Sequence, residues 1–106
     1  MSAPTPENAL SPAGRFAPSP SGDLHLGNLR TALAAWGFAR ATGRRFLLRV
    51  EDLDRVKQGA AERNVADLRE LGLDWDGPVA LQSERIPLLL DRVRTLTDAG
   101  LTYECY

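Results

Sequence analysis

Two short segments hold most of the residues whose chemistry suits a substrate site. The first, residues 15–28, runs Arg-Phe-Ala-Pro-Ser-Pro-Ser-Gly-Asp-Leu-His-Leu-Gly-Asn, and the second, residues 48–55, runs Leu-Arg-Val-Glu-Asp-Leu-Asp-Arg. The first is a loop of small residues before a predicted helix, where free backbone N–H groups and the positive end of the helix dipole favour a phosphate. Gly27 would let a ligand approach the backbone closely. Both segments are therefore candidates for a substrate site.

His25 is the only histidine of the chain and lies one turn before the predicted helix. It would donate a hydrogen bond to a phosphate oxygen and stabilise charge that develops in a transition state. For a lone loop histidine the structural alternative is more common: the glycines and prolines form a turn, and the histidine is exposed or caps the helix. The histidine alone does not decide between the two.

The composition is that of an ordinary soluble globular protein, with 43% apolar residues, 25% charged residues and a net charge of −1. This charge gives no indication of a nucleic-acid partner. The single cysteine, Cys105, excludes an internal disulfide. No apolar run approaches the roughly 18 residues of a membrane span, and the N-terminus has no signal pattern. We therefore expect a cytoplasmic protein without a membrane partner. The sequence leaves the oligomeric state open, and we favour a monomer.

The elements that would position these segments follow from apolar spacing and from glycine and proline. Residues 1–13 predict a disordered leader, and residues 14–106 predict one ordered domain. A strand over 14–17 would end at Pro18 and Pro20. A helix of about 14 residues would follow, with Asn28 as N-cap, an end near Gly43 and an apolar stripe of Leu29, Leu33, Trp36 and Ala39. Residues 46–50 predict a second strand.

The second half of the chain predicts two more helices and two short strands. One helix spans 60–71, with Ala61, Val65 and Leu68 inward, and a turn over 74–78 precedes a strand over 79–81. The other helix starts near Ser83 and ends at Gly100, with an inward stripe of Ile86, Leu89, Leu90, Val93 and Leu96. Residues 103–106 predict the start of another strand, and Trp36 and Trp75 are core candidates.

This order predicts an α/β fold with a parallel sheet covered by helices. A strand, a loop, a helix and a second strand form a βαβ unit, whose crossover helix implies parallel strands. In such sheets ligands bind beyond the carboxyl ends of the strands. The two segments rich in functional groups, 18–28 and 51–55, fall at these ends.

The same two segments resemble those of class I aminoacyl-tRNA synthetases of the glutamate-activating branch. Residues 18–28 resemble the family's "HIGH" region, with His-Leu-Gly-Asn at 25–28 as the four-residue signature, and residues 48–55 are similar to its "RIEDTD" stretch. Asn28 departs from the usual histidine of the signature. The resemblance covers residues 14–106 and implies the first half of a Rossmann-like, parallel-sheet nucleotide-binding domain.

The resemblance also implies the reaction and the residue roles. The carboxylate of glutamate would attack the α-phosphorus of ATP, which brings Mg²⁺, to give glutamyl-adenylate and pyrophosphate. His25, Gly27 and Asn28 would contact ATP, with His25 and Asn28 catalytic. L-glutamate would be held by Arg15, Phe16, Ala17, Pro18, Ser19 and Glu51.

Within this glutamate site, Arg15 suits a carboxylate and Glu51 would accept from the α-ammonium group. A solvated loop carboxylate is the structural alternative for Glu51. Asp52 is left without a role, and Asp54 would pair with Arg15 or Arg55 or cap the next segment.

Finer features favour a shortened paralogue of glutamyl-tRNA synthetase, without an anticodon-binding region, whose acceptor is the queuosine base of tRNA(Asp). These features are Leu29, the compact segment 73–85 and the end at 103–106. Cys105 would start a Cys-x-Cys zinc site with its other ligands beyond Tyr106, whereas the sequence alone favours a buried free thiol. A glutamyl-tRNA synthetase acting on tRNA(Glu) and a non-catalytic nucleotide-binding or partner-binding module remain alternatives. The 106 residues include no lysine-containing "KMSKS" stretch, so we expect an inactive fragment.

Overall fold

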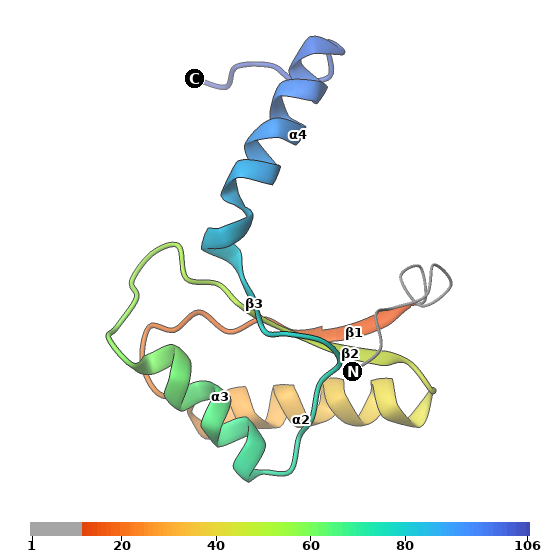
Figure 1. The fold of residues 1–106 in the computed structure, drawn as a ribbon, viewed down its shortest axis with the longest axis vertical. Helices are drawn as coiled ribbons and strands as arrows, with labels where there is room; N and C mark the ends of the chain where they lie inside the picture. The colour runs from red at the N-terminus through yellow and green to blue at the C-terminus, as the bar shows by residue number, and fades with distance from the viewer. Residues whose placement is uncertain (1–11) are drawn as a thin grey trace.

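A three-stranded parallel sheet forms the centre of the molecule. The computed structural model describes residues 12–106, so residues 1–11 of the predicted leader, 1–13, lie outside the described part, and Ala13 belongs to the first strand. The strands β1 (Ala13–Phe16), β2 (Arg45–Val50) and β3 (Ala80–Leu81) lie in the order β1-β2-β3. Helix α2 (Leu26–Ala41) connects the first two strands, and α3 (Ala60–Glu70) connects the second and third (Figure 1). The predicted α/β fold is confirmed, with β1 beginning at Ala13.

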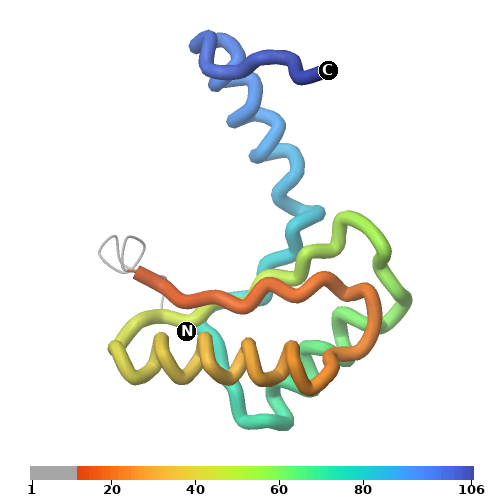
Figure 2. Tube along the Cα trace, turned by 180° about the vertical axis from the view of Figure 1, so that it is seen from behind, coloured from red at the N-terminus to blue at the C-terminus, as the bar shows by residue number. Residues whose placement is uncertain are grey.

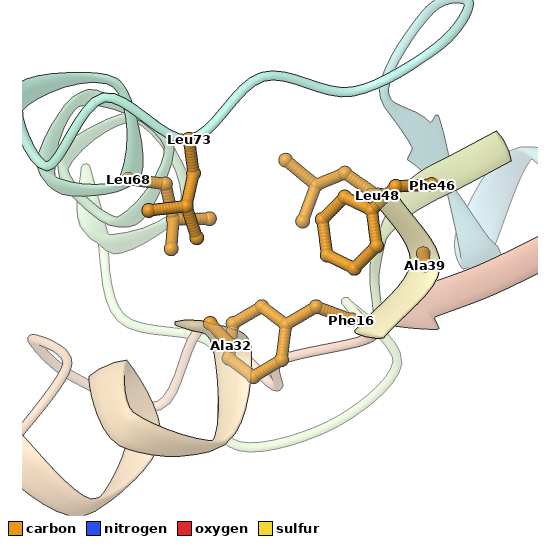
Figure 3. Packing of buried hydrophobic residues seen from close by; sticks show 7 residues of the cluster. All are labelled: Phe16, Ala32, Ala39, Phe46, Leu48, Leu68 and Leu73. Carbon is orange, nitrogen blue, oxygen red and sulfur yellow. The ribbon is translucent and has the colours of Figure 1, made fainter. Parts of the chain in front are cut away.

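The core lies between the sheet and the helices α2 and α3. Along β2 every second side chain, Phe46, Leu48 and Val50, is 1–2% exposed. Phe46 and Leu48 belong to a layer in which side chains from the strands face side chains from the helices (Figure 3). The buried residues of this layer are Phe16, Ala32, Ala39, Phe46, Leu48, Leu68 and Leu73. Trp36 and Trp75, which were predicted as core residues, are partly buried and pack against the edge of this layer. The opposite face of β2 presents Arg45, Leu47 and Arg49.

Helix α2 differs from its prediction in where it begins and in which side it buries. It begins at Leu26 with His25 as N-cap, so the predicted N-cap Asn28 is wrong. Leu33, predicted to face inward, is exposed, and the buried positions are Ala32 and Ala39. Small side chains are needed because helix and sheet approach closely: a Cβ at Gly14 would lie 3.0 Å from the Cβ of Ala39. Apolar spacing alone does not show this need.

Two carboxylates tie the predicted turn at 74–78 to α2 and to the start of β2. The indole N–H of Trp36 donates to Asp74 (2.7 Å), and Arg40 forms ion pairs with Asp74 (3.0 Å) and Asp76 (2.7 Å). Asp76 also accepts from the backbone N–H of Phe46 (2.8 Å), while its own N–H donates to the Phe46 carbonyl (2.8 Å). These bonds fix the end of the sheet opposite the loops rich in functional groups.

Helix α4 (Ile86–Asp98) projects away from the sheet on the side opposite α2 and α3 (Figures 1 and 2). It follows the short 3-10 helix η1 (Gln82–Arg85). The helix was predicted, but its apolar stripe was predicted to face inward and is instead 39–52% exposed. Too little of the described chain lies against α4 to bury it. None of the described helices is long and apolar enough to cross a membrane.

The predicted strand over residues 103–106 is wrong, because the chain after α4 has no regular structure. A strand needs a neighbour whose backbone groups pair with its own. Within residues 12–106 no such neighbour lies beside this segment.

Candidate active site

The two segments rich in functional groups meet beyond the carboxyl ends of β1 and β2. The N–H of Glu51 donates to the carbonyl of Pro18 (2.9 Å), and the N–H of Lys57 donates to the carbonyl of Pro20 (2.9 Å). Both prolines are buried. Because a proline has no N–H group, neither buried position has a backbone donor that needs a partner. The carbonyl of each proline is paired with the second loop. The backbone thus places residues 17–25 beside residues 51–57.

His25 caps α2 with its imidazole ring. The backbone N–H of Asn28 donates to Nδ1 of His25 (3.3 Å), and the backbone N–H of His25 donates to Oδ1 of Asn28 (3.1 Å). A neutral imidazole whose Nδ1 accepts has its proton on Nε2. The capping alternative considered from the sequence is therefore correct. It is also compatible with a donor role, because Nε2–H is left for a ligand.

Gly27 has a structural reason for its lack of a side chain. A Cβ at this position would lie 2.9 Å from Cε1 and 3.0 Å from Nδ1 of the His25 ring. Any larger residue at position 27 would displace the imidazole from its capping position. The sequence predicted that Gly27 admits a ligand, and the structure adds that it admits the ring of His25.

A cavity of about 460 Å³ lies beyond the end of β1, beside the first turn of α2. Its lining comprises Phe16, Ala17, Pro18, Ser19, Ser21, Gly22, Asp23, Leu24, His25 and Asn28. The predicted nucleotide-contacting residues His25 and Asn28 are therefore together at one cavity. The Phe16 ring belongs to the core and faces α2, which leaves its backbone for contact with a small substrate.

Helix α3 supports the floor of this cavity through two polar residues that sequence reasoning missed. Arg63 donates to the carboxylate of Asp23 (2.6 Å). With its amide oriented to satisfy both groups, Asn64 donates to the carbonyls of Gly22 (3.2 Å) and Ala60 (3.1 Å). Asn64 is 1% exposed, so these bonds satisfy an otherwise costly buried amide. The sequence did contain a signal for Asn64, because a polar residue stands next to Val65 at a position that faces inward.

Arg15, Arg49 and Glu51 lie on the other face of the sheet, away from α2. Arg15 is paired in register with Leu47, and side chains alternate along both strands. Arg49, near the end of β2, donates to Glu51, the residue that directly follows the strand (2.9 Å), and about a third of each side chain is exposed. The carboxylate of Glu51 is therefore held in an ion pair and is not freely solvated. Sequence reasoning assigned no role to Arg49.

A second cavity, of about 550 Å³, lies on this face between the sheet and the start of α4. It is lined by Arg15, Arg45, Leu47, Leu48, Arg49, Asp76, Gly77, Pro78, Ala80, Gln82, Arg85 and Leu89. Four of these residues are arginines. The face that holds Glu51 is thus predominantly cationic, which suits a ligand carboxylate, and Glu51 is an acidic group there that suits an ammonium group.

The remaining acidic residues of the second loop have separate partners. Asp52 accepts from the N–H (2.8 Å) and the hydroxyl (2.6 Å) of Ser83, and these bonds hold the pKa of Asp52 below its usual value. Asp54 pairs with Arg55 at 3.6 Å on the surface, one of the partners expected from the sequence. Neither carboxylate lines the two cavities described above.

Cys105 is exposed, so the buried thiol favoured by the sequence alone is wrong. Among residues 12–106, no group of three or more His, Cys, Asp or Glu residues is placed to hold a metal ion. Structural zinc usually has four protein ligands, and one thiol supplies one of them. The residues present in this part of the chain do not make up a zinc site.

The family comparison agrees with this architecture, which has a parallel sheet, a capped helix after the first strand and two loops joined at the strand ends. The profile of the family described as tRNA synthetases class I (E and Q), catalytic domain, matches residues 13–106. The chain belongs to this family.

The chain is similar to individual glutamyl-Q tRNA(Asp) synthetases and to a glutamate–tRNA ligase. The chain is 71% identical over 94 residues to a glutamyl-Q tRNA(Asp) synthetase from Nocardia farcinica, covering 89% of this chain and 30% of the relative. It is 45% identical over 104 residues to a glutamate–tRNA ligase 1 from Dinoroseobacter shibae, covering 96% of this chain and 22% of the relative. The chain thus spans less than a third of the length of either relative.

A solved structure shows the same fold. The glutamate tRNA ligase from Elizabethkingia meningosepticum, in complex with its amino acid, superposes with a TM-score of 0.75 at 38% identity. The match covers 81% of this chain and 19% of that chain. The βαβ architecture described above is therefore one that class I tRNA synthetases contain.

Proposed function

We propose that this chain is the N-terminal part of the catalytic domain, from residue 14 onward, of an enzyme that activates L-glutamate with ATP and transfers it to the queuosine base of tRNA(Asp). The observation on which the activation step rests is the arrangement of His25. Its ring caps α2, its Nε2–H is free to donate, and it lines a cavity at the carboxyl end of the sheet. The similarity to glutamyl-Q tRNA(Asp) synthetases supports the choice of acceptor.

In this proposal the phosphates of ATP bind at the N-terminus of α2. The free N–H groups of the first turn and the helix dipole favour negative charge there. A carboxylate oxygen of glutamate forms a bond to the α-phosphorus, and the bond from this phosphorus to the pyrophosphate oxygen breaks. The Nε2–H of His25 donates to an α-phosphate oxygen as charge develops on it, so no protein nucleophile is required.

The substrate glutamate binds between the strand ends on the cationic face. Arg15 holds one carboxylate, and Glu51 accepts from the α-ammonium group while it keeps its ion pair with Arg49. Backbone atoms of residues 16–19 complete the site at the end of β1. Because Glu51 and His25 are attached to loops joined at Pro18, binding of the amino acid and of ATP would place the reacting atoms together.

The remaining parts of the proposal concern the whole protein. Mg²⁺ accompanies the ATP phosphates, and the protein acts as a monomer in the cytoplasm. Any zinc site would take Cys105 as one ligand and its other ligands from outside the described residues. A glutamate–tRNA ligase that uses tRNA(Glu) is the second candidate, and the 45% identity to such a ligase supports it.

The full-length protein tests this proposal in two assays. Glutamate-dependent exchange between ATP and pyrophosphate, without tRNA, is the expected sign of adenylate formation. Labelled glutamate is then offered with queuosine-containing tRNA(Asp) and, separately, with tRNA(Glu). Label on tRNA(Asp) alone is expected. Label on tRNA(Glu) alone would favour the second candidate, and no exchange with any amino acid would refute the activation step.

A further inference from the structure

Asp52 is the neighbour of Glu51 in sequence, yet its side chain has a different partner. One carboxylate oxygen accepts the backbone N–H of Ser83 (2.8 Å), and the other accepts the Ser83 hydroxyl (2.6 Å). Both residues are half-buried. Hydrogen bonds to an ionised carboxylate are shorter and stronger than neutral ones. The pair is thus the firmest described link between the loop after β2 and the segment after β3.

The link continues the register of the sheet beyond its last strand residues. Val50 is opposite Leu81 in the β2–β3 ladder, and Asp52 and Ser83 follow two residues later on each strand. On the other side, the N–H of Glu51 continues the β1–β2 pairing to the carbonyl of Pro18. Residues 51 and 52 are therefore held by both neighbouring segments, and the residues that follow, 53–55, form exposed bends.

We infer that Asp52 is a positioning residue, which sets the place of the Glu51 carboxylate by fixing the backbone of the loop to Ser83. The inference rests on the proposed function, because it assigns Glu51 to the substrate ammonium group. The side chain of Asp52 lines neither of the two cavities described above. Ser83 lies in η1, which leads into α4, so the same link fixes the point at which α4 leaves the sheet.

A purely structural role for Asp52 makes a different prediction. If the link only stabilised the fold, its loss would lower the amount of active enzyme. It would then affect the kinetics with ATP and the kinetics with glutamate equally. A positioning role acts on one carboxylate, so it changes the KM for glutamate and leaves the KM for ATP nearly unchanged. Two variants remove the link from either end: Asp52→Ala removes both acceptors, and Ser83→Ala removes only the hydroxyl donor.

The test measures glutamate-dependent ATP–pyrophosphate exchange in the full-length protein. Each variant is expected to raise the KM for glutamate, by about tenfold for Asp52→Ala and less for Ser83→Ala, since a hydrogen bond to a charged group is lost. Ser83→Thr, which keeps a hydroxyl, should restore the wild-type value. The double variant should be no worse than Asp52→Ala, because both changes remove one interaction. Glu84→Ala, an exposed acidic neighbour, is the matched control and should change neither KM.

The inference is wrong if Asp52→Ala leaves the KM for glutamate unchanged, or raises both KM values equally. A wild-type protein without exchange activity would refute the proposed function, and the positioning role is then decided by hydrogen exchange. In that measurement the amide of Glu51 should exchange faster in Asp52→Ala than in Glu84→Ala. Equal exchange rates in the two variants would overturn the role of Asp52 whether or not the enzyme activates glutamate.

Discussion

At the scale of single residues, His25 combines an observed role as the cap of α2 with the proposed role as a donor to ATP. The Nδ1 atom caps α2, and this bond determines that the remaining proton is on Nε2. The sequence predicted the segment 18–28 and treated the two roles as alternatives. It did not predict that Gly27 is needed for the ring to lie in its place.

The two roles of His25 can be separated by substitution. His25→Asn keeps a good N-cap but places no donor at the position of Nε2, whereas His25→Ala removes both. In the full-length protein we expect both variants to raise the activation free energy of adenylate formation by about 2.7–4 kcal/mol. This slows the reaction on the order of 100- to 1000-fold. Only His25→Ala should also lower the free energy of unfolding, by about 1 kcal/mol.

Single-turnover rates and urea unfolding measure these two effects. If His25→Asn forms adenylate at the wild-type rate, the imidazole acts only as a cap. Leu26→Ala is a suitable control, since this neighbouring side chain is largely exposed.

At the scale of elements, the bonds between the turn at 74–78, α2 and β2 determine how the sheet is held at its far end. The backbone N–H of Phe46 lowers the pKa of Asp76, and burial acts against this shift. The Trp36 indole and Arg40 lower the pKa of Asp74. Three separate elements thus depend on two ionised carboxylates.

Acidification should weaken this link in a predictable direction. Because the pKa of Asp76 is lowered on folding from its ordinary 3.8, its stabilising effect is present above about pH 4 and is lost as the pH falls below it. We expect Asp76→Asn to lower the free energy of unfolding at pH 7 by about 1 kcal/mol, a value reduced for its partial exposure. The difference from wild type should shrink toward pH 3.

Urea unfolding at several pH values measures this difference. Asp98→Asn, on exposed α4, provides the control and should follow the wild-type curve. A constant difference between Asp76→Asn and wild type from pH 7 to pH 3 would show that the charge of Asp76 is not responsible.

Sequence patterns predicted elements well where a side chain's role is local. The strand at 46–50, the helix at 60–71 and the crossover topology follow from apolar spacing, glycine stops and the βαβ order, and all are found. The pairing of Arg49 with Glu51 was also within reach, since residues two apart share a face of a strand. By contrast, Arg63 with Asp23 and Asp52 with Ser83 are 40 and 31 residues apart, and no local pattern indicates such pairs.

At the scale of the whole molecule, the described chain consists of a packed unit and a projecting helix. The radius of gyration is 16.3 Å, above the roughly 13 Å of a compact domain of this size. The difference comes from α4, which extends away from the sheet (Figure 2). Helical periodicity predicted the helix correctly but could not show whether a partner layer is present for its apolar stripe.

This division predicts unequal effects of two leucine substitutions in the 106-residue chain. Leu48→Ala creates space in the core and should lower the free energy of unfolding by about 2–5 kcal/mol. Leu90→Gln changes a side chain that is 52% exposed and should change it by less than about 0.5 kcal/mol. Urea unfolding followed by the fluorescence of Trp36 and Trp75 reports on the packed unit, because both rings contact the core. A loss above 2 kcal/mol for Leu90→Gln would show that α4 packs on the sheet in solution.

The shortness of β1 also restricts how two copies of the chain can associate. Within the described residues, β1 forms one edge of the sheet, and an exposed edge is a place where a strand from another molecule can add. After Phe16 the chain leaves the strand for the loop whose Pro18 and Pro20 carbonyls accept from the second loop. Only the four residues Ala13–Phe16 are extended at this edge, which gives an incoming strand little length to bind. A very short edge strand is one way in which a sheet limits edge-to-edge aggregation.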